Sequence, residues 1–470
     1  MAQTFKLLID GALVDGERTI DVINPATEEV VAPCPVASRA QLDDAVTAAQ
    51  AAQKLWSRTT LEERRVVLSA VADRIEGGRE ELARVLTAEQ GKPLGDSYWE
   101  IDFLCATIRH FLTYDLPVEI NEDSAARRVE IHYRPLGVVA GIIPWNFPLG
   151  LIGNKLPPAL LAGNSLIIKP APTTPLATLL VGELIADVVP KGLITIIADA
   201  NDLGDVLTRH PGIAKVSFTG STATGKKVME AAAGGLKRVT LELGGNDPAI
   251  VLDDADPKDV AAGLFQSSFA NSGQVCVAVK RAYVHEAIYD EVVDELTVLA
   301  SEAVVGDGSQ QGVRFGPIQN HQQYQKALQF LEVARRDGKI TAGGDPVDGP
   351  GFFMRPTIVR DIEDGSPLVD DEQFAPILPV IRFSDEDDAI RRANASDLGL
   401  GASVWSGSAE RAHAVASQIE AGTVWVNQHL DLGPSIPLAP AKQSGFGIEM
   451  GYEGLKQFTQ MMVINTRKVG

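Results

Sequence analysis

Apolar runs alternate with amphipathic stretches along residues 138–243, and this alternation predicts the central part of the fold. Runs of continuous apolar character, which are expected to be strands, lie at 138–143, 165–169, 193–197, 215–219 and 239–243. Stretches with helical spacing separate them, at 150–162, 175–188, 202–209 and 222–233. Strands of this kind that alternate with helices predict a parallel sheet covered on both faces.

The same alternation returns further along the chain. Expected strands lie at 249–252, 282–284, 357–360, 378–383, 402–405 and 423–426. Expected helices lie at about 257–270, 287–303, 320–337, 386–394 and 408–419. This region therefore predicts a second α/β domain.

The first third of the chain has a different pattern. Residues 5–35 read as short strands, with hairpin signals at Asp10-Gly11 and Asp15-Gly16. Capping boxes at Ser38-Arg-Ala-Gln41 and Thr59-Thr-Leu-Glu62 then predict the starts of two helices. Two more helices are expected at 79–90 and 95–114, and we assign these helices to packing.

Two segments have the alternation of a partly exposed ribbon. Residues 118–134 alternate between apolar and polar positions on both sides of a charged link, and 463–467 read as an edge strand. Because an isolated hairpin is only marginally stable, the ribbon is expected to lean on something else, such as another subunit.

Composition and charge exclude several classes of protein. The chain has 470 residues, of which 45% are hydrophobic and 22% charged, as in a folded protein of two or three domains. Its net charge of −20 repels phosphate backbones, so general binding of nucleic acid is not expected. We interpret the acidity as a contribution to solubility.

Cysteine usage and hydropathy indicate a cytoplasmic protein. The three cysteines are too few for a stapled secreted scaffold, and the first residues lack the apolar core of a signal peptide. The most apolar window, 136–152, is interrupted by Pro144 and Pro148, so no membrane span is expected.

One of these cysteines lies in an unusual loop, Phe269-Ala-Asn-Ser-Gly-Gln-Val-Cys276. It has no His or Cys neighbours at the spacing of a metal site. Cys276 is either a thiolate nucleophile that uses a distant carboxylate as its base, or an inert buried thiol.

The residues that follow the predicted parallel strands are the next candidates, because ligands bind beyond the carboxyl ends of such strands. Asn146 lies in a proline-flanked turn and either donates to an oxyanion or is a turn asparagine. Lys169 either reaches a ribose or phosphate or is a solvated charge. Glu242 is either a base with a raised pKa or a salt-bridged core carboxylate. Gly220-Ser-Thr-Ala-Thr-Gly225 opens a helix and fits a pyrophosphate site, although a capped tight turn explains it as well.

Taken together, these residues resemble the aldehyde dehydrogenase superfamily, with matching order and spacing from about Ile9 to the C-terminus. The motifs that carry the resemblance are Asn24-Pro-Ala-Thr27, Pro144-Trp-Asn-Phe-Pro148, Lys169-Pro170, Phe218-Thr-Gly-Ser221, Leu241-Glu-Leu-Gly-Gly-Asn-Asp-Pro248, Asn271-Ser-Gly-Gln-Val-Cys276, Glu372-Gln-Phe-Ala-Pro376 and Lys442-Gln-Ser-Gly445.

The resemblance implies an α/β fold with three parts. These are a Rossmann-type parallel-sheet cofactor domain formed by 1–114 and 136–244, an α/β catalytic domain at 245–443, and a small β oligomerisation ribbon with a C-terminal arm at 115–135 and 444–470. It also implies a homodimer or a homotetramer.

The resemblance also implies catalytic roles. Cys276 would be the nucleophile and Glu242 the general base. Asn146 and the backbone N–H of Cys276 would form the oxyanion hole, and Lys155 would help to relay protons. Attack on an aldehyde would give a thiohemiacetal, hydride transfer would leave a thioester, and water activated by Glu242 would release the acid. Because an ordinary thiol is little ionised at neutral pH, local electrostatics are expected to lower the pKa of Cys276.

Further residues would bind the cofactor and the substrate. Lys169 would hold the adenosine ribose, Glu372 the nicotinamide ribose and Ser221 the pyrophosphate. Phe374 would border the nicotinamide. The remaining cofactor-binding positions are Trp145, Pro172, Gly220, Gly225 and Leu243. A largely aliphatic substrate pocket would be lined by Phe147, Leu151, Asn154, Val275, Val277 and Leu438, with Leu430 and Leu432 in the same loop. It suits an aliphatic or small aromatic aldehyde, and no metal is expected.

The chain departs from the family's pattern at two single residues and in one three-residue segment. Pro172 stands where many NAD-preferring members carry a glutamate, so NAD is expected while NADP stays an alternative. Ala375 replaces a glycine, and Leu438-Ala439-Pro440 replaces a common Phe-Gly-Gly. Two other functions are also weighed: a CoA-acylating aldehyde dehydrogenase, which Glu242 disfavours, and a catalytically idle structural relative, which would be expected to lack Cys276 or Glu242.

Overall fold

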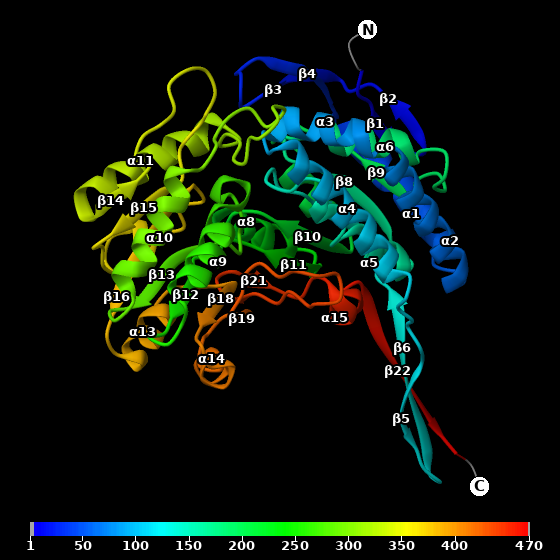
Figure 1. The fold of residues 1–470 in the computed structure, drawn as a ribbon. Helices are drawn as coiled ribbons and strands as arrows, with labels where there is room; N and C mark the ends of the chain where they lie inside the picture. The colour runs from blue at the N-terminus through cyan, green and yellow to red at the C-terminus, as the bar shows by residue number, and fades with distance from the viewer. Residues whose placement is uncertain (1–3, 469–470) are drawn as a thin grey trace.

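Two mainly parallel sheets lie side by side, and a narrow antiparallel ribbon projects from the side of the first (Figure 1). The structure is a computed structural model and describes residues 4–468. It confirms the predicted α/β class with parallel sheets. The predicted domain bounds at residues 1 and 470 lie outside the described residues.

The first sheet has eight strands. Its order is β2 (Ala12–Val14), β1 (Leu7–Ile9), β9 (Ile194–Ile196), β8 (Ser165–Lys169), β7 (Val138–Ile142), β10 (Lys215–Thr219), β11 (Arg238–Glu242) and β21 (Gly445–Phe446). The five strands from β9 to β11 are parallel, and β1 and β21 are antiparallel to their neighbours. The parallel strands are fully buried except for the start of β11, as continuous apolar runs require.

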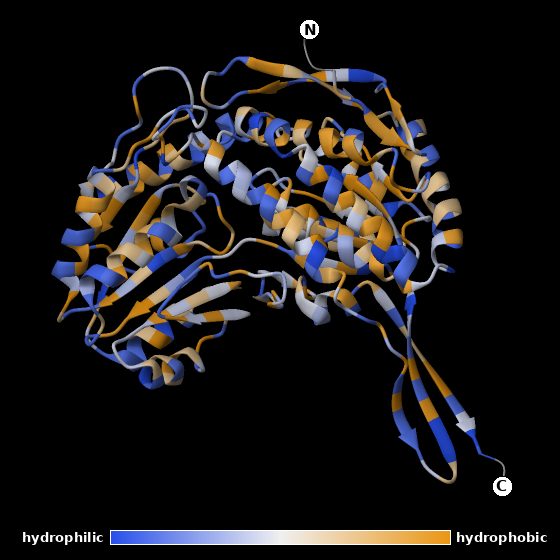
Figure 2. Cartoon of the chain, turned by 45° about the vertical axis from the view of Figure 1, so that its right-hand side comes forward, coloured by the Kyte–Doolittle hydropathy of each residue, from blue (hydrophilic) through white to orange (hydrophobic). Residues whose placement is uncertain are grey.

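The helices that cover the first sheet lie either directly on its faces or on other helices of the same group. They are α1 (Arg39–Trp56), α2 (Leu61–Gly77), α3 (Arg79–Gln90), α4 (Leu94–Phe111), α5 (Leu156–Leu161), α6 (Leu176–Ile185), α7 (Gly204–Arg209) and α8 (Thr222–Ala233). The helix α1 contacts β7 and β8, and α8 contacts β10 and β11. Hydrophobic residues gather on the strands and on the helix faces turned toward them (Figure 2).

The second sheet has seven strands. Its order is β14 (Lys339–Ala342), β15 (Thr357–Arg360), β16 (Ile377–Phe383), β13 (Val279–His285), β12 (Asp247–Val251), β18 (Gly401–Trp405) and β19 (Thr423–Val426). All pairs except β14–β15 are parallel. Its helices are α9 (Pro257–Phe269), α10 (Tyr289–Ser301), α11 (His321–Asp337), α12 (Pro367–Asp370), α13 (Glu386–Asn394) and α14 (Ala409–Ala416).

The ribbon is a three-stranded antiparallel sheet. Its order is β22 (Thr459–Arg467), β6 (Arg127–Pro135) and β5 (Glu119–Asp123), so the C-terminal strand pairs with a segment more than 300 residues earlier. The helix α15 (Gly451–Lys456) leads into it, and two small pairs, β3 (Arg18–Ile23) with β4 (Val30–Val36) and β17 (Leu398–Gly399) with β20 (Ala441–Lys442), complete the strands.

Local details differ from the sequence predictions. The capping box at Ser38 forms as expected, but the second box is built by Thr60 and Glu63, one residue later than predicted. The predicted helix at 150–162 is a 3₁₀ turn, η1 (Gly150–Ile152), followed by the short α5, which has Pro157 in its first turn. Asp15-Gly16 does not close a hairpin, because the strand after it, β3, pairs with β4.

Candidate active site

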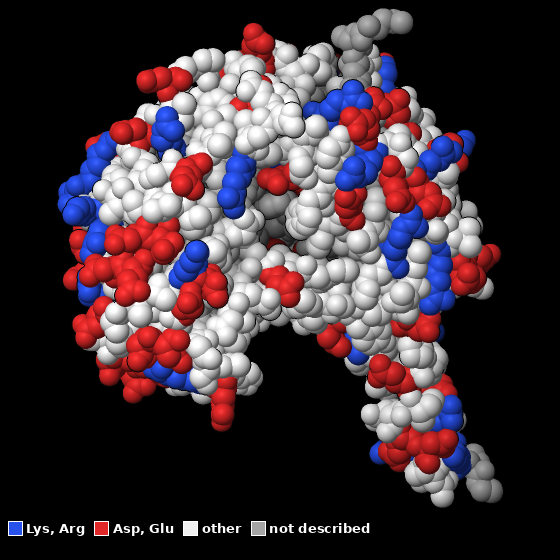
Figure 3. All heavy atoms as spheres, viewed as in Figure 1, with Lys and Arg blue, Asp and Glu red and all other residues white. Residues whose placement is uncertain are grey.

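The carboxyl ends of the parallel strands of the first sheet open onto a cavity of about 950 Å³. Because parallel strands end at the same edge, residues that are distant in sequence meet there. Five of the predicted cofactor residues line this cavity: Trp145, Lys169, Pro172, Gly220 and Ser221. Figure 3 shows a recess at the centre of the displayed face, between the parts of the chain that carry the two sheets.

Lys169 ends β8 and is held by a carboxylate that the sequence analysis did not single out. Its Nζ lies 2.6 Å from Oδ1 of Asp199, which is fully buried, and the other oxygen of Asp199 accepts from the backbone N–H of Leu203. The ion pair leaves little net positive charge beside Pro172. Asp199 follows shortly after a predicted strand, so inspection of that strand end could have found it.

The helix α8 begins at the cavity. Ser221 caps this helix and accepts from the backbone N–H of Thr224 at 3.3 Å. Gly225 and Leu243 do not line the cavity; instead they pack on each other, because a Cβ on Gly225 would lie 2.4 Å from Cδ2 of Leu243. The glycine therefore lets the helix approach the residue that follows β11, and the cofactor contact expected for these two residues stays a prediction.

The loop that carries the thiol is tightly shaped. Behind α9, the backbone enters the left-handed region at Asn271 and Ser272, with φ of 48° and 56°. The Asn271 amide donates to the backbone oxygen of Asn146 at 3.0 Å. The Asn146 amide in turn donates to the backbone oxygen of Gln274, also at 3.0 Å. These two bonds fix the predicted oxyanion donor beside the thiol loop.

An apolar cluster surrounds the thiol. Cys276 is partly exposed and packs with Phe147, Leu430, Leu432, Val275, Val277 and Leu438. Two predicted lining residues lie elsewhere: Leu151 packs against the core of the first sheet, and Asn154 is buried with its amide donating to Glu449 at 2.8 Å. The cluster thus includes Phe147, Val275, Val277 and Leu438 among the predicted lining residues, and the place of Leu151 and Asn154 in the lining stays a prediction.

The pKa of Cys276 is raised to about 12, mainly by burial. The charge of Lys280 lowers this pKa, whereas the charges of Glu242, Glu372 and Asp247 add to the increase. The prediction of a lowered pKa is therefore wrong for this conformation of the protein. The physical reason is that the apolar cluster and three carboxylates outweigh one ammonium. The thiol must lose its proton to a base when it reacts.

Glu242 is the candidate for the base that takes the proton of Cys276. It ends β11, is 3% exposed, and neither of its carboxylate oxygens has a hydrogen-bond partner among the described residues. Burial raises its pKa well above the ordinary value, the charge of Glu449 raises it further, and Lys155 lowers it. A buried carboxylate with a raised pKa accepts a proton more readily than an ordinary one.

Next to it lies a buried polar cluster. Lys155 donates to Oε1 of Glu449 at 2.7 Å and to the Thr219 hydroxyl at 2.8 Å, and Ser217 also donates to Glu449. The sequence analysis missed Glu449, which is fully buried near the C-terminus. No local pattern around it signals burial, because its partners come from distant strands.

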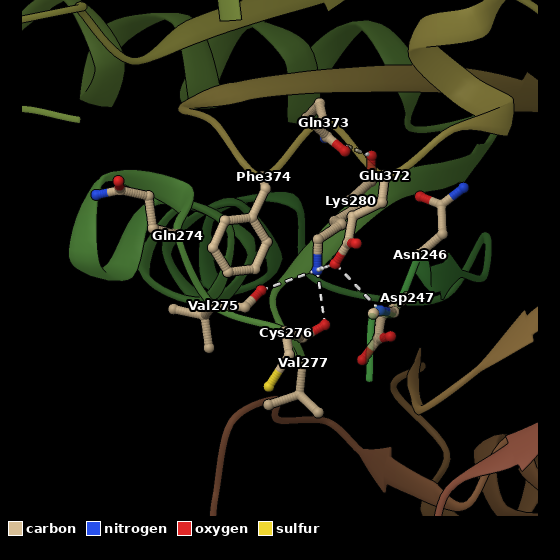
Figure 4. Close-up of polar contacts among 12 residues, drawn as sticks. Asn246, Asp247, Gln274, Val275, Cys276, Val277, Lys280, Glu372, Gln373 and Phe374 are labelled. Atoms are coloured by element: carbon tan, nitrogen blue, oxygen red, sulfur yellow. Dashed lines mark hydrogen bonds and ion pairs between the residues drawn. The ribbon is translucent and has the colours of Figure 1, made fainter. Parts of the chain in front are cut away.

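Glu372 and Phe374 lie in the segment before β16 and do not line the cavity themselves, but Phe374 contacts Trp145, which does. The rings of Phe374 and Trp145 meet edge to face with centroids 5.5 Å apart, and Glu372 accepts from the backbone N–H of Gly245 at 3.1 Å. The buried Lys280 stands between Glu372 and the thiol loop (Figure 4). A lysine inside the apolar strand 279–285 is the sequence signal that could have identified it.

Within residues 4–468, no group of three or more His, Cys, Asp or Glu side chains is arranged to hold a metal ion. In the same part of the chain, no helix has the length and apolar character needed to cross a membrane. Acidic and basic side chains are interspersed over the face shown in Figure 3, without a broad basic surface.

Comparisons with known proteins bear on the family and the fold of the chain. Residues 13–464 match the model of the aldehyde dehydrogenase family. The chain is 38% identical to aldehyde dehydrogenase LUC3 of a Fusarium species over 98% of both chains. It is 37% identical to phenylacetaldehyde dehydrogenase of Pseudomonas fluorescens, covering 97% of this chain and 94% of that one. The solved NAD⁺ complex of an aldehyde dehydrogenase from Bacillus cereus superposes with a TM-score of 0.96 at 34% identity, covering 99% and 97% of the two chains.

Proposed function

The chain belongs to the aldehyde dehydrogenase family, and from that premise we propose that it oxidises an aldehyde to the carboxylic acid with NAD through a covalent intermediate on Cys276. The observation that carries the proposal is that an amide and a carboxylate both approach the thiol. The Asn146 amide bonds the loop two residues before Cys276, and the Glu242 carboxylate is close enough to perturb the pKa of its thiol.

The residues around the cavity suit a dinucleotide. The N-terminus of α8, capped by Ser221, favours an anion, and Lys169 supplies ammonium donors at the end of β8. Trp145 and Phe374 offer an aromatic border for a flat ring, and Glu372 offers a carboxylate for ribose hydroxyls. When bound, NAD supplies the acceptor for the hydride.

Cys276 begins the reaction when its proton passes to Glu242, so that the sulfur attacks the carbonyl carbon and forms a thiohemiacetal. The oxyanion that develops lies within reach of the Asn146 amide and the backbone N–H of Cys276. Loss of hydride leaves a thioester. After Glu242 has given up this first proton, it takes a proton from the attacking water, and it passes that second proton to the departing sulfur, so that the carboxylic acid and the thiol form.

The buried pair of Lys155 and Glu449 offers a route for the proton that Glu242 has taken up. Glu242 has no partner of its own among the described residues, while the pair is within electrostatic reach of it. The pair can therefore accept or return a proton without a bulk-water channel through the apolar lining.

The lining of the cluster around Cys276 favours a small aliphatic or aromatic aldehyde, because its side chains are apolar and offer no charge to a substrate. The relative from Pseudomonas fluorescens is named for an aromatic aldehyde, which fits the same chemistry. Glu242 beside the thiol favours water over CoA as the acyl acceptor.

We also propose the three-part division of the chain that the resemblance implies, at 1–114 with 136–244, at 245–443, and at 115–135 with 444–470. The start of the last segment, 444–470, does not belong to the ribbon alone, because Gly445 and Phe446 form β21, which pairs with β11 in the first sheet. The projecting ribbon supports a homo-oligomer, either a dimer or a tetramer, since Met461 and Val463 on its outer strand are exposed.

The proposal is tested by stopped-flow reduction of NAD and NADP with a panel of aliphatic and aromatic aldehydes. We expect NAD to be reduced, the acid to form without CoA, and Cys276→Ala to abolish turnover while cofactor binding survives. Retention of turnover in Cys276→Ala, or a strict requirement for CoA, would contradict the proposed mechanism.

A further inference from the structure

Lys280 is a buried lysine at the start of β13, and the buried Arg281 follows it in the same strand. Lys280 is 2% exposed. Its Nζ donates to the backbone oxygens of Val275 and Cys276, at 2.8 and 2.7 Å (Figure 4). One ammonium therefore holds the two carbonyls nearest to the thiol, while the thiol points away from it (Figure 4).

The same ammonium faces the carboxylate of Glu372. Nζ lies 3.8 Å from Oε1 of Glu372, and that oxygen also accepts from the backbone N–H of Gly245. The approach is close, because a Cβ on Gly244 would lie 2.4 Å from Oε2 of Glu372. Lys280 thus joins the thiol loop, on one side, to a carboxylate at the edge of the cofactor cavity, on the other.

The charge of Lys280 acts against several unfavourable effects at the thiol. Cys276 faces Glu242, Glu372 and Asp247, each of which raises its pKa in addition to burial, whereas Lys280 lowers it. Burial raises the pKa of Asp247 to about 7, while the charges of Lys280 and Arg281 lower this pKa. Removal of the ammonium would leave three carboxylates beside the thiol without this cation.

We propose that Lys280 is a positioning residue for the oxidation: its ammonium fixes the Cys276 backbone and the Glu372 carboxylate in one arrangement, and its charge eases formation of the thiolate. This inference rests on the proposed function for the roles of Cys276 and Glu372. A lysine that only satisfied buried carbonyls would support the fold, and its loss would leave the pH dependence of the thiol unchanged.

Three variants separate charge from packing. Lys280→Met removes the charge and keeps most of the volume. Lys280→Gln removes the charge but can still donate to a carbonyl. It replaces Lys280→Met in the experiment if the Met variant does not fold. Lys280→Arg keeps the charge. The matched control is Lys442→Met, because Lys442 also bonds two carbonyls and one glutamate, but on β20 and partly exposed.

The first measurement is the rate of Cys276 alkylation by iodoacetamide from pH 7 to pH 10, followed by mass spectrometry of the intact, folded protein. At each pH we expect the rate to fall on the order of tenfold in Lys280→Met and Lys280→Gln, because one nearby cation is lost. The rate in Lys280→Arg and Lys442→Met should stay close to that of the unmodified protein.

The second measurement is the affinity for NAD and the split between KM and kcat. We expect weaker NAD binding in the uncharged variants, because Glu372 loses its ion pair, together with a lower kcat. Folded Lys280→Gln or Lys280→Met with unchanged alkylation would overturn the inference. Alkylation and NAD binding need no turnover, so they test the role of Lys280 independently of the proposed oxidation. The proposed oxidation itself is contradicted only if the unmodified protein oxidises no aldehyde.

Discussion

The turn that carries Asn146 rests on a buried ion pair, and breaking this pair should cost both stability and turnover. Lys92 and Glu100 have side chains with no exposed surface, and Nζ lies 2.5 Å from Oε2. Lys92 also donates to the backbone oxygen of Asn146 at 2.9 Å. The other oxygen of Glu100 accepts from the backbone N–H groups of Leu149 and Gly150.

Glu100→Gln is the informative substitution. The amide oxygen of Gln can still accept from Leu149 and Gly150, so the turn keeps its backbone partners. The ammonium of Lys92 is left buried without a counter-charge, and removal of one partner from a buried pair costs about 3–5 kcal/mol. The double variant Lys92→Met/Glu100→Gln removes both charges, so it should recover most of this loss.

Urea unfolding followed by fluorescence and circular dichroism gives the free energies for the four proteins of the cycle. We expect a coupling energy of at least about 2 kcal/mol. The kcat of Glu100→Gln should also fall, because an amide displaced by about 1 Å no longer meets the oxyanion. Ordinary surface substitutions change the free energy of unfolding by up to about 0.5 kcal/mol. If Glu100→Gln stays within this range of the parent, the reasoning is refuted.

Four further predictions concern the site itself. Asn146→Ala should lower kcat on the order of a hundredfold, since one oxyanion donor supplies roughly 3 kcal/mol, and steady-state kinetics with unchanged NAD binding would show it. Because burial raises the pKa of Cys276 to about 12, its alkylation rate should rise about tenfold per pH unit from 7 to 10; a plateau near pH 8 would contradict this. Asp199→Asn frees the charge of Lys169 and should raise kcat/KM with NADP relative to NAD on the order of tenfold, whereas the exposed Asp202→Asn serves as a control without this effect. Burial raises the pKa of Glu242, so the native state loses stability as pH rises from the unfolded pKa toward the folded one; Glu242→Gln should therefore melt at a higher temperature than the parent at pH 8, with the gain absent at pH 4.

Local pattern was sufficient for most of the elements. The predicted bounds of α8, α13, β15 and β19 agree with the structure, because helical and continuous apolar periodicities are read from neighbouring residues. The errors lie where the pattern is ambiguous. Pro157 and Pro158 shorten the helix predicted at 150–162, and two adjacent threonines left the exact cap undetermined.

Part of the site could likewise be predicted from the sequence. Strand ends in the sequence identified Asn146, Lys169 and Ser221, and the structure places all three at one edge of the first sheet. Gly225 belongs to the motif of Ser221 and Leu243 to the motif of Glu242, and neither lines the cavity; a Cβ on Gly225 would meet Leu243, while their contact with the cofactor stays a prediction. A motif indicates that a glycine is needed, whereas only the neighbours show what the glycine is needed for.

The sequence by itself determined the family, the order of the elements and the identity of the thiol, because these depend on residue types and their spacing. Only the tertiary structure decided the electrostatics of that thiol. Lys155 and Glu449 are 294 positions apart. Sequence signals point to Asp199 and Lys280 as residues, but only the fold shows that they pair with Lys169 and Glu372. Because a pKa depends on burial and on charges through space, the direction of the shift at Cys276 was fixed by the fold and was opposite to the prediction.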